Sequence, residues 1–233
     1  MPELVILLPT KNEEEGIGEV IDRLPTKEEI SRLGYSLKIV VADGHSTDKT
    51  CQIAEEKGAM IIHQEGGAGK GNGVREALEV IFEKFSDKGS LLIMMDGDAT
   101  YSPEDVVTFI EILQENEVVW GSRMRGNIAK NAMSKTNWFG NWILSLTASI
   151  VFLKRTTDLC TGYWGFRLTS LRKLHLTAEG FNLEADLFAS VAKSKMRTSE
   201  IPIDYSHREG QSNLKWYRDG PRIMLMTISH RFK

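Results

Sequence analysis

Short apolar runs recur through the first half of the chain, and each is followed by a segment with helical spacing. The runs predict strands at residues 3–9, 36–43, 59–63, 90–96 and 117–121. The segments between them predict helices at residues 14–24, 48–57, 73–85 and 103–114. Continuous apolar runs are typical of strands buried on both faces of a parallel sheet. This alternation predicts an α/β fold with a mostly parallel central sheet flanked by helices.

Polar residues gather where four of the predicted strands end. These clusters cover residues 9–13, 43–48, 96–98 and 121–123. Ligands of parallel α/β sheets bind beyond the carboxyl ends of the strands. The four clusters therefore predict one site at one edge of the sheet.

The third cluster, Asp96-Gly97-Asp98, places two carboxylates two residues apart at a strand end. Such a pair can converge on Mg²⁺ or Mn²⁺, which take carboxylate oxygens and often bind substrate phosphates as well. We expect Gly97 to permit a tight turn between the two acids. A structural turn or helix cap is the alternative interpretation of this short motif.

A glycine-rich segment, residues 66–73, precedes the third predicted helix. Its backbone N–H groups could meet an anion or a nucleobase edge, and a flexible turn is the alternative. It is neither a dinucleotide fingerprint nor a P-loop, because Asn72 and Gly71 stand where those motifs require other residues. Neither a zinc motif nor a nucleophile elbow is found, and two cysteines exclude a disulfide framework.

Residues 137–153 carry no charge, and Trp138 and Trp142 lie four residues apart within them. The segment is shorter than the roughly 20 residues that cross a bilayer. It predicts either a helix in a membrane interface or a buried core helix, and these residues alone favour neither. Residues 220–233 are apolar with basic flanks and suit an interface helix or a docked tail.

The composition is that of a globular protein: 233 residues, 41% hydrophobic and 26% charged. The net charge of −3 divides unevenly, because residues 1–120 carry −13 and residues 121–233 carry +10. A basic half suggests an anionic partner. No nucleic-acid-binding motif accompanies it, so we expect no nucleic acid. The N-terminal residues lack the features of a signal peptide, which predicts a cytoplasmic protein.

Taken together, the motifs resemble those of family 2 glycosyltransferases with the GT-A fold. Within that family the chain is similar to the polyprenyl-phosphate sugar synthases, of the dolichyl-phosphate mannose or glucose synthase type. The resemblance covers nearly the whole chain in order. The motifs that carry it are LPTKNEEE, VVADGHSTDKT, GAGKGNGVREAL, MMDGDATYSPED, WGSRM, DLCTGYWGFR, GFNLEADLFASVAK and EIPIDYSHREGQSNLKWYRDG. The departures are Ala42, His45, Thr100, Tyr101 and Asn213, which affect the nucleobase and sugar preference.

The resemblance implies a single GT-A domain over residues 1–233. Residues 1–121 would bind a nucleotide-sugar donor, and residues 122–233 would bind the acceptor, with interface helices near 137–153 and 215–232. Asp96 and Asp98 would hold Mg²⁺ or Mn²⁺, and Asp98, Arg123 and Asp158 would form the catalytic set. The implied donor-binding residues are Pro9, Asn12, Glu13, Asp43, Lys70 and Asp96. The implied acceptor-phosphate residues are Arg123, Lys135, Arg208 and Ser212.

The implied reaction is metal-dependent transfer of a sugar to a polyprenyl phosphate with inversion at the anomeric carbon. The enzyme would work peripherally at the cytoplasmic face of a membrane. The donor would be UDP- or GDP-linked, and the wording of the motifs DGHSTD and DGDATY favours UDP. Two alternatives stay open. One is a family 2 enzyme with a soluble sugar or protein acceptor, and the other is a non-catalytic nucleotide-binding scaffold.

Overall fold

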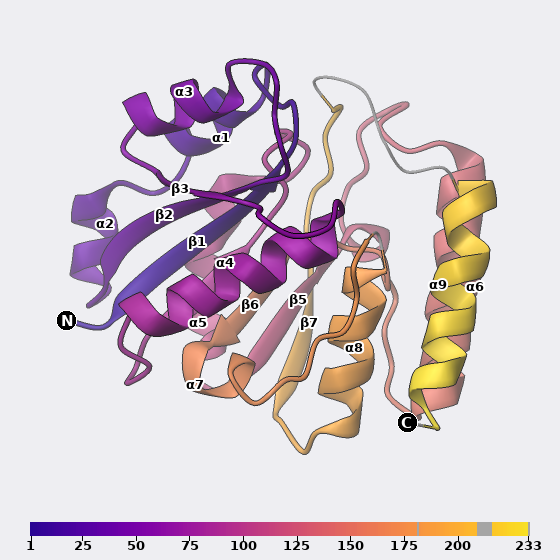
Figure 1. The fold of residues 1–233 in the computed structure, drawn as a ribbon. Helices are drawn as coiled ribbons and strands as arrows, with labels where there is room; N and C mark the ends of the chain where they lie inside the picture. Colours follow the sequence, from indigo (N-terminus) through magenta and orange to yellow (C-terminus); the bar gives the residue numbers. More distant parts are fainter. Residues whose placement is uncertain (181, 209–215, 233) are drawn as a thin grey trace.

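One mixed sheet with helices on both faces forms the core of the molecule (Figure 1). The computed structural model describes residues 1–180, 182–208 and 216–232. Within these residues the strand order is β3-β2-β1-β4-β6-β5-β7. The strands are β1 (Glu3–Thr10), β2 (Ser36–Asp43), β3 (Met60–His63), β4 (Leu91–Met94), β5 (Val118–Ser122), β6 (Trp164–Arg167) and β7 (Thr198–Pro202).

Helices connect most of the strands. The α-helices are α1 (Ile17–Asp22), α2 (Lys27–Arg32), α3 (Thr50–Glu56), α4 (Lys70–Lys84), α5 (Val106–Leu113), α6 (Lys135–Phe152), α7 (Leu168–Leu171), α8 (Leu183–Lys193) and α9 (Trp216–His230). Two short 3₁₀ turns are η1 (Pro103–Asp105) and η2 (Arg123–Arg125).

The sheet is parallel except at β6. Strand β1 pairs in parallel with β2 and β4, β2 with β3, and β5 with β7. Strand β6 runs antiparallel to both of its neighbours, β4 and β5. The predicted α/β class and the mostly parallel sheet are therefore confirmed. Strands from both halves of the sequence join this one sheet.

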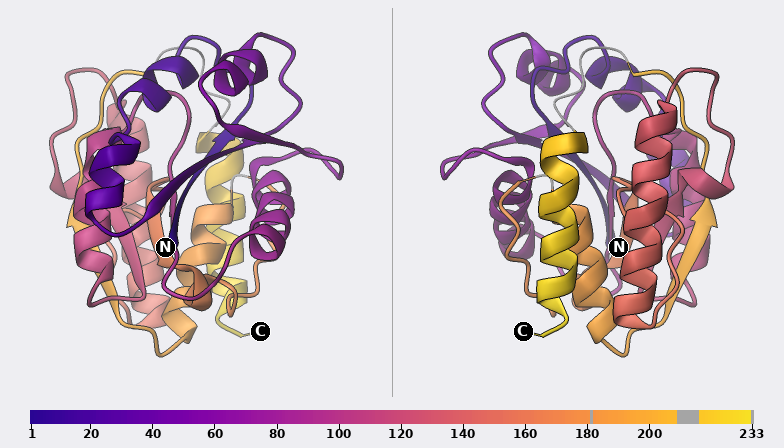
Figure 2. Two further views of the ribbon diagram at one scale, coloured as in Figure 1. Left: turned by 90° about the vertical axis from the view of Figure 1, so that its left-hand side faces the viewer. Right: turned by 90° about the vertical axis from the view of Figure 1, so that its right-hand side faces the viewer.

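Alternate side chains of β1 enter two separate hydrophobic cores, as the two-residue period of a strand requires. Val5 and Leu7 pack in the core covered by α4, α6, α8 and α9. Leu4, Ile6 and Leu8 pack in the core covered by α1, α2, α3 and α5. Figure 2 shows these helices on opposite sides of the sheet. Burial on both faces explains why these strands have continuous apolar sequences.

Several element boundaries differ from the sequence predictions. Helix α4 begins at Lys70 rather than residue 73, so part of the glycine-rich segment is helical. The predicted helix 103–114 divides into η1 and α5, and the Ser102 side chain makes no capping hydrogen bond. Helix α2 and strands β6 and β7 were not predicted.

The uncharged segment lies within α6, which has one buried face and one exposed apolar face. One face of α6 is buried, through Asn141, Leu144, Ser145, Ala148 and Phe152. The opposite face exposes Trp138, Phe139, Trp142, Leu146 and Ile150. Helix α9 lies beside α6 (Figures 1 and 2) and exposes Leu225 and Ile228. No helix among the described residues is both long and apolar enough to cross a membrane.

Asp105, at the start of α5, gives a first testable prediction. Burial, with Asp204 and Glu104 nearby, raises its pKa from 3.8 to about 6. The folded protein therefore holds this proton more tightly than the unfolded chain, and folding stability falls as the pH rises through about 4 to 6. Asp105→Asn removes this cost. We expect the variant to be more stable than wild type by about 1 kcal/mol near pH 8, after allowance for solvent screening.

Urea unfolding of both proteins near pH 8 and near pH 3 measures the effect. The stability difference should largely disappear near pH 3, where the carboxyl is mostly protonated in both folded and unfolded states. A difference of equal size at both pH values would contradict the assignment to this proton.

Candidate active site

A cavity of about 840 Å³ opens at the carboxyl ends of β1, β2, β4 and β5. All four predicted polar clusters contribute to its walls, which also include the start of α4 and residues of α6, α8 and α9. Seven of the predicted site residues line it: Pro9, Glu13, Lys70, Asp96, Asp98, Arg123 and Arg208. The cavity also extends between α6 and α9, where Ile143, Leu144, Ile223 and Met224 line it.

Asp98 is fixed by the loop that follows β4. Its Oδ1 accepts hydrogen bonds from the Thr100 backbone N–H, at 3.1 Å, and the Thr100 hydroxyl, at 2.6 Å. Ala99 adopts a φ of 59°, a strained backbone conformation of the kind that gathers at functional sites. With only 3% of its surface exposed, Asp98 presents its other oxygen, Oδ2, to the cavity wall.

Gly97 is required for a reason other than the predicted turn. Its φ is not in the left-handed region. A Cβ atom at this position would lie 2.5 Å from Cγ2 of Thr10 and 3.1 Å from Cδ1 of Ile17. Gly162 has a similar role behind the other acid, since a Cβ there would lie 2.6 Å from Oδ2 of Asp96. Both glycines therefore let neighbouring segments approach the carboxylates closely.

Lys70 joins two acids across the cavity. Its Nζ lies 2.5 Å from Oδ1 of Asp96 and 2.7 Å from Oε1 of Glu184, which is on α8. Burial alone would lower the pKa of Lys70, but the two carboxylates outweigh it and raise that pKa. The glycines around it allow the start of α4 to reach this position, because a Cβ at Gly71 would lie 2.4 Å from the Ala178 carbonyl oxygen.

Arg208 joins two further acids of the cavity wall. Its Nη1 lies 2.9 Å from Oδ2 of Asp98, and its Nη2 donates to Oε1 of Glu13. Burial raises the pKa of Glu13 to about 7, against the opposing effect of the Arg208 guanidinium. Burial and the neighbouring Asp96 raise the pKa of Asp98, against Arg208 and Thr100. Both carboxyls therefore bind a proton more readily than an isolated carboxyl does.

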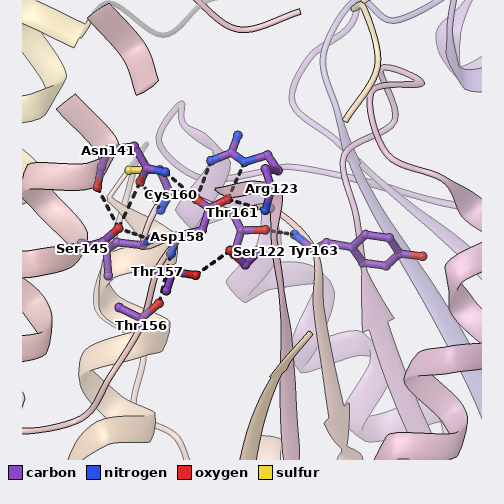
Figure 3. Close-up of polar contacts among 12 residues, drawn as sticks. Ser122, Arg123, Asn141, Ser145, Thr156, Thr157, Asp158, Cys160, Thr161 and Tyr163 are labelled. Atoms are coloured by element: carbon purple, nitrogen blue, oxygen red, sulfur yellow. Dashed lines mark hydrogen bonds and ion pairs between the residues drawn. The ribbon is translucent and has the colours of Figure 1, made fainter. Parts of the chain in front are cut away.

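Arg123 is held by a buried ion pair with Asp158 (Figure 3). Its Nε and Nη2 donate to the two oxygens of Asp158, each at 2.7 Å, and its backbone N–H donates to the same carboxylate at 2.9 Å. Asn141 of α6 adds a fourth donor at 2.7 Å. The Arg123 guanidinium also lies 5.1 Å above the Tyr205 ring. Asp158 has no exposed surface, so it orients Arg123 from behind.

Other predicted residues lie away from the cavity wall. Oδ1 of Asn12 accepts from the Thr47 N–H at 2.8 Å. Asp43 accepts from the Ser46 N–H at 3.0 Å and lies 3.1 Å from Nδ1 of His63. Lys135 is exposed at the start of α6. Ser212 lies outside the described residues.

Residues that the sequence did not single out complete the site. Asn141 donates a hydrogen bond to Asp158, and the Tyr205 ring lies beneath the Arg123 guanidinium. The sequence could have pointed to Asn141, because it is a polar residue on the buried face of a mostly apolar helix. Tyr205 lies within the quoted motif EIPIDYSHREGQSNLKWYRDG, but the motif alone assigned it no role. Cys51 joins Asp43 and His63 in a cluster whose potential ligand atoms all lie within 4.8 Å of one another.

The cavity suits a divalent cation. Asp96 and Asp98 both present carboxylate oxygens, the ligands that Mg²⁺ and Mn²⁺ prefer. Each acid also forms an ion pair with a long cationic side chain, Asp96 with Lys70 and Asp98 with Arg208.

Comparison with known proteins agrees with these observations. The sequence model of Glycosyl transferase family 2 matches residues 5–175. Glycosyltransferase AglJ of Haloferax volcanii is 34% identical over 223 residues, which cover 94% of this chain and 69% of that protein. The dolichyl-phosphate hexose transferase of the same organism is 29% identical over 224 residues, covering 95% and 90%.

A solved structure resembles the chain over almost its whole length. It is glucosyl-3-phosphoglycerate synthase from Mycobacterium tuberculosis in complex with Mn²⁺, uridine diphosphate and glucosyl-3-phosphoglycerate. The TM-score is 0.69 at 19% identity, and the match covers 99% of this chain and 80% of that one. This likeness confirms the predicted GT-A fold.

Proposed function

The chain belongs to glycosyl transferase family 2, and from that premise we propose that it transfers a hexose from a nucleotide sugar to a polyprenyl phosphate, with inversion at the anomeric carbon. The observation that carries the proposal is the form of the cavity. One end holds paired carboxylates and arginines, and the other lies between two apolar helices. A long lipid with a phosphate head group has the same division of polar and apolar parts.

The donor end of the proposed site is the part nearest β1 and β4. Asp96 and Asp98 would hold Mg²⁺ or Mn²⁺, which when bound offsets the charge of a leaving nucleoside diphosphate. Pro9 and Glu13 line the cavity beside them, and Lys70 keeps Asp96 in place. Asn12 and Asp43 would act from behind this wall by fixing the loop after β2.

The acceptor end needs cations more than a base. A phosphate monoester is already anionic at neutral pH, so no side chain has to remove a proton before it attacks. Arg123 and Arg208 reach the cavity wall, and guanidinium groups suit bidentate contacts with phosphate. Asp158 holds Arg123 in one orientation through two hydrogen bonds to the guanidinium. Lys135 and Ser212 remain further candidates for contacts with the acceptor.

The proposed place of work is the cytoplasmic surface of a membrane, because a polyprenyl tail is buried in a bilayer. The exposed faces of α6 and α9 support peripheral binding there. Trp138 is 44% exposed, Trp142 is 45% exposed and Ile150 is 65% exposed. Tryptophan side chains are enriched at membrane interfaces, where an apolar ring with one polar atom is favoured.

Replacing Trp138 and Trp142 together by serine tests this surface. We expect binding to liposomes to fall by about tenfold or more, since two aromatic side chains no longer leave water. Binding of uridine diphosphate should not change, because neither residue lines the cavity. Liposome sedimentation and nucleotide titration give the two readouts. A matched control is Leu33→Ser, which removes an exposed apolar side chain far from α6. Unchanged liposome binding in the double variant would argue against this surface.

A radiolabel transfer assay tests the reaction itself. Purified protein is mixed with UDP- or GDP-linked hexoses, Mn²⁺ or Mg²⁺, and a short polyprenyl phosphate. Label that moves into the organic phase with one donor supports the proposal and identifies base and sugar together. Metal-dependent release of nucleoside diphosphate without lipid labelling would replace the lipid by a soluble acceptor. Absence of both activities would favour a non-catalytic scaffold.

A further inference from the structure

The two acids proposed to hold the metal are each paired with a cationic side chain, and the two pairs differ. Lys70 binds Asp96 and also Glu184, while Arg208 binds Asp98 and also Glu13. Arg123 adds no free charge, because Asp158 neutralises it. Each of the two proposed metal ligands is therefore held by one cationic side chain.

Arg208 occupies the oxygen that a metal would need. Both hydrogen bonds from Thr100 go to Oδ1 of Asp98, which is thereby committed to the loop. Only Oδ2 is left to face the cavity, and Nη1 of Arg208 lies 2.9 Å from it. A metal ion at this oxygen would repel the guanidinium beside it, so the two cations compete for Oδ2.

Arg208 is also able to form further bonds. Its Nε is buried and has no hydrogen-bond partner among the described residues. Its side chain is 27% exposed and lines the cavity. If Nη1 leaves Asp98 while Nη2 stays on Glu13, Nη1 becomes available for a new acceptor in the cavity. Phosphate oxygens are acceptors that guanidinium groups favour.

We propose that Arg208 holds the place of the metal in the free enzyme, and that metal binding releases it to bind the phosphate of the acceptor. This inference rests on the proposed function, since it takes Asp96 and Asp98 as the metal ligands. Arg208 then couples two binding events at one site. By thermodynamic linkage, the metal raises affinity for the acceptor phosphate by the same factor by which that phosphate raises affinity for the metal.

The test measures Mn²⁺ binding without nucleotide, by the electron paramagnetic resonance signal of free Mn²⁺. Arg208→Gln removes the competing charge, and we expect it to bind Mn²⁺ about tenfold more tightly than wild type. Arg208→Lys should bind Mn²⁺ as weakly as wild type, because the lysine keeps a positive charge at this position. Arg23→Gln is the matched control, since Arg23 also bridges two acids, Glu19 and Glu104, far from the cavity. It should bind Mn²⁺ like wild type.

The second measurement repeats the titrations with farnesyl phosphate, and with farnesol as the uncharged control. In wild type, farnesyl phosphate should tighten Mn²⁺ binding and farnesol should not. In Arg208→Gln the effect of farnesyl phosphate should be lost. Thermal unfolding of each variant checks that the site is folded under the conditions of the titration.

The outcomes separate this inference from the proposed function. Equal or weaker Mn²⁺ binding by folded Arg208→Gln would overturn the exchange, even if wild type transfers sugar to lipid. Persistent coupling to farnesyl phosphate in that variant would overturn the second part. By contrast, equal Mn²⁺ binding by Asp98→Asn and by wild type would show that Asp98 is not a metal ligand, which contradicts the proposed function itself.

Discussion

Asp98→Asn is expected to lower the rate of sugar transfer by about a thousandfold, the effect of losing several kcal/mol of stabilisation of the leaving diphosphate. The asparagine carbonyl can keep both hydrogen bonds from Thr100, because these go to a single oxygen. The amide nitrogen would then face the cavity, where it cannot bind a cation. The loss should therefore arise from the site and not from the loop around it.

Two measurements distinguish loss of the metal site from disruption of the surrounding loop. Initial rates of transfer give the effect on activity, and Mn²⁺-dependent binding of uridine diphosphate gives the effect on the metal site. Asp22→Asn, which alters an exposed acid paired with Lys57, is the matched control and should behave like wild type. A folded Asp98→Asn protein with more than a tenth of wild-type activity would rule out a metal-binding role for this residue.

Asp158→Ala should cause the largest loss of stability, about 3–5 kcal/mol. Asp158 is fully buried and accepts hydrogen bonds from the Arg123 backbone, the Arg123 guanidinium and Asn141. Its removal leaves a buried guanidinium without its partner, which costs more than the pair itself contributes. A typical domain has only about 5–15 kcal/mol of stability, so much of the protein would unfold under mild denaturation.

Urea unfolding of three proteins tests this prediction. Asp87→Ala breaks an exposed pair with Arg172 and should cost less than about 1 kcal/mol. The double variant Asp158→Ala with Arg123→Met removes both buried charges and should recover a large part of the stability lost by the single variant. If Asp158→Ala is no less stable than Asp87→Ala, the buried ion pair is unimportant for folding stability.

The strand-end clusters were predictable because their positions follow from local sequence. Asp96 and Asp98 come directly after an apolar run, and parallel strands place such positions at one edge. Helix α2 was also predictable, because a threonine followed three residues later by a glutamate is typical of a helix start. In the structure these residues, Thr26 and Glu29, form a capping box.

The ion pairs that organise the cavity could not be predicted in the same way. Arg208 and Glu13 are 195 positions apart, and Lys70 and Glu184 are 114 positions apart. No local pattern specifies such contacts. Strand β7 has no apolar run to predict it, because its first three residues, Thr198 to Glu200, are polar. In the structure, the Trp120 indole N–H and the Thr157 hydroxyl both donate to the Glu200 carboxylate, which gives a charged residue a place beside the core.

The antiparallel strand β6 has a consequence for synthesis on the ribosome. It fills the position between β4 and β5, although it follows β4 by about 70 residues. At about 5–20 residues per second, several seconds pass between the emergence of the two strands. During that time β4 presents an unpaired, fully apolar edge of the kind that recruits strands from other chains. Chaperones that cover exposed apolar edges should therefore raise the yield of folded protein.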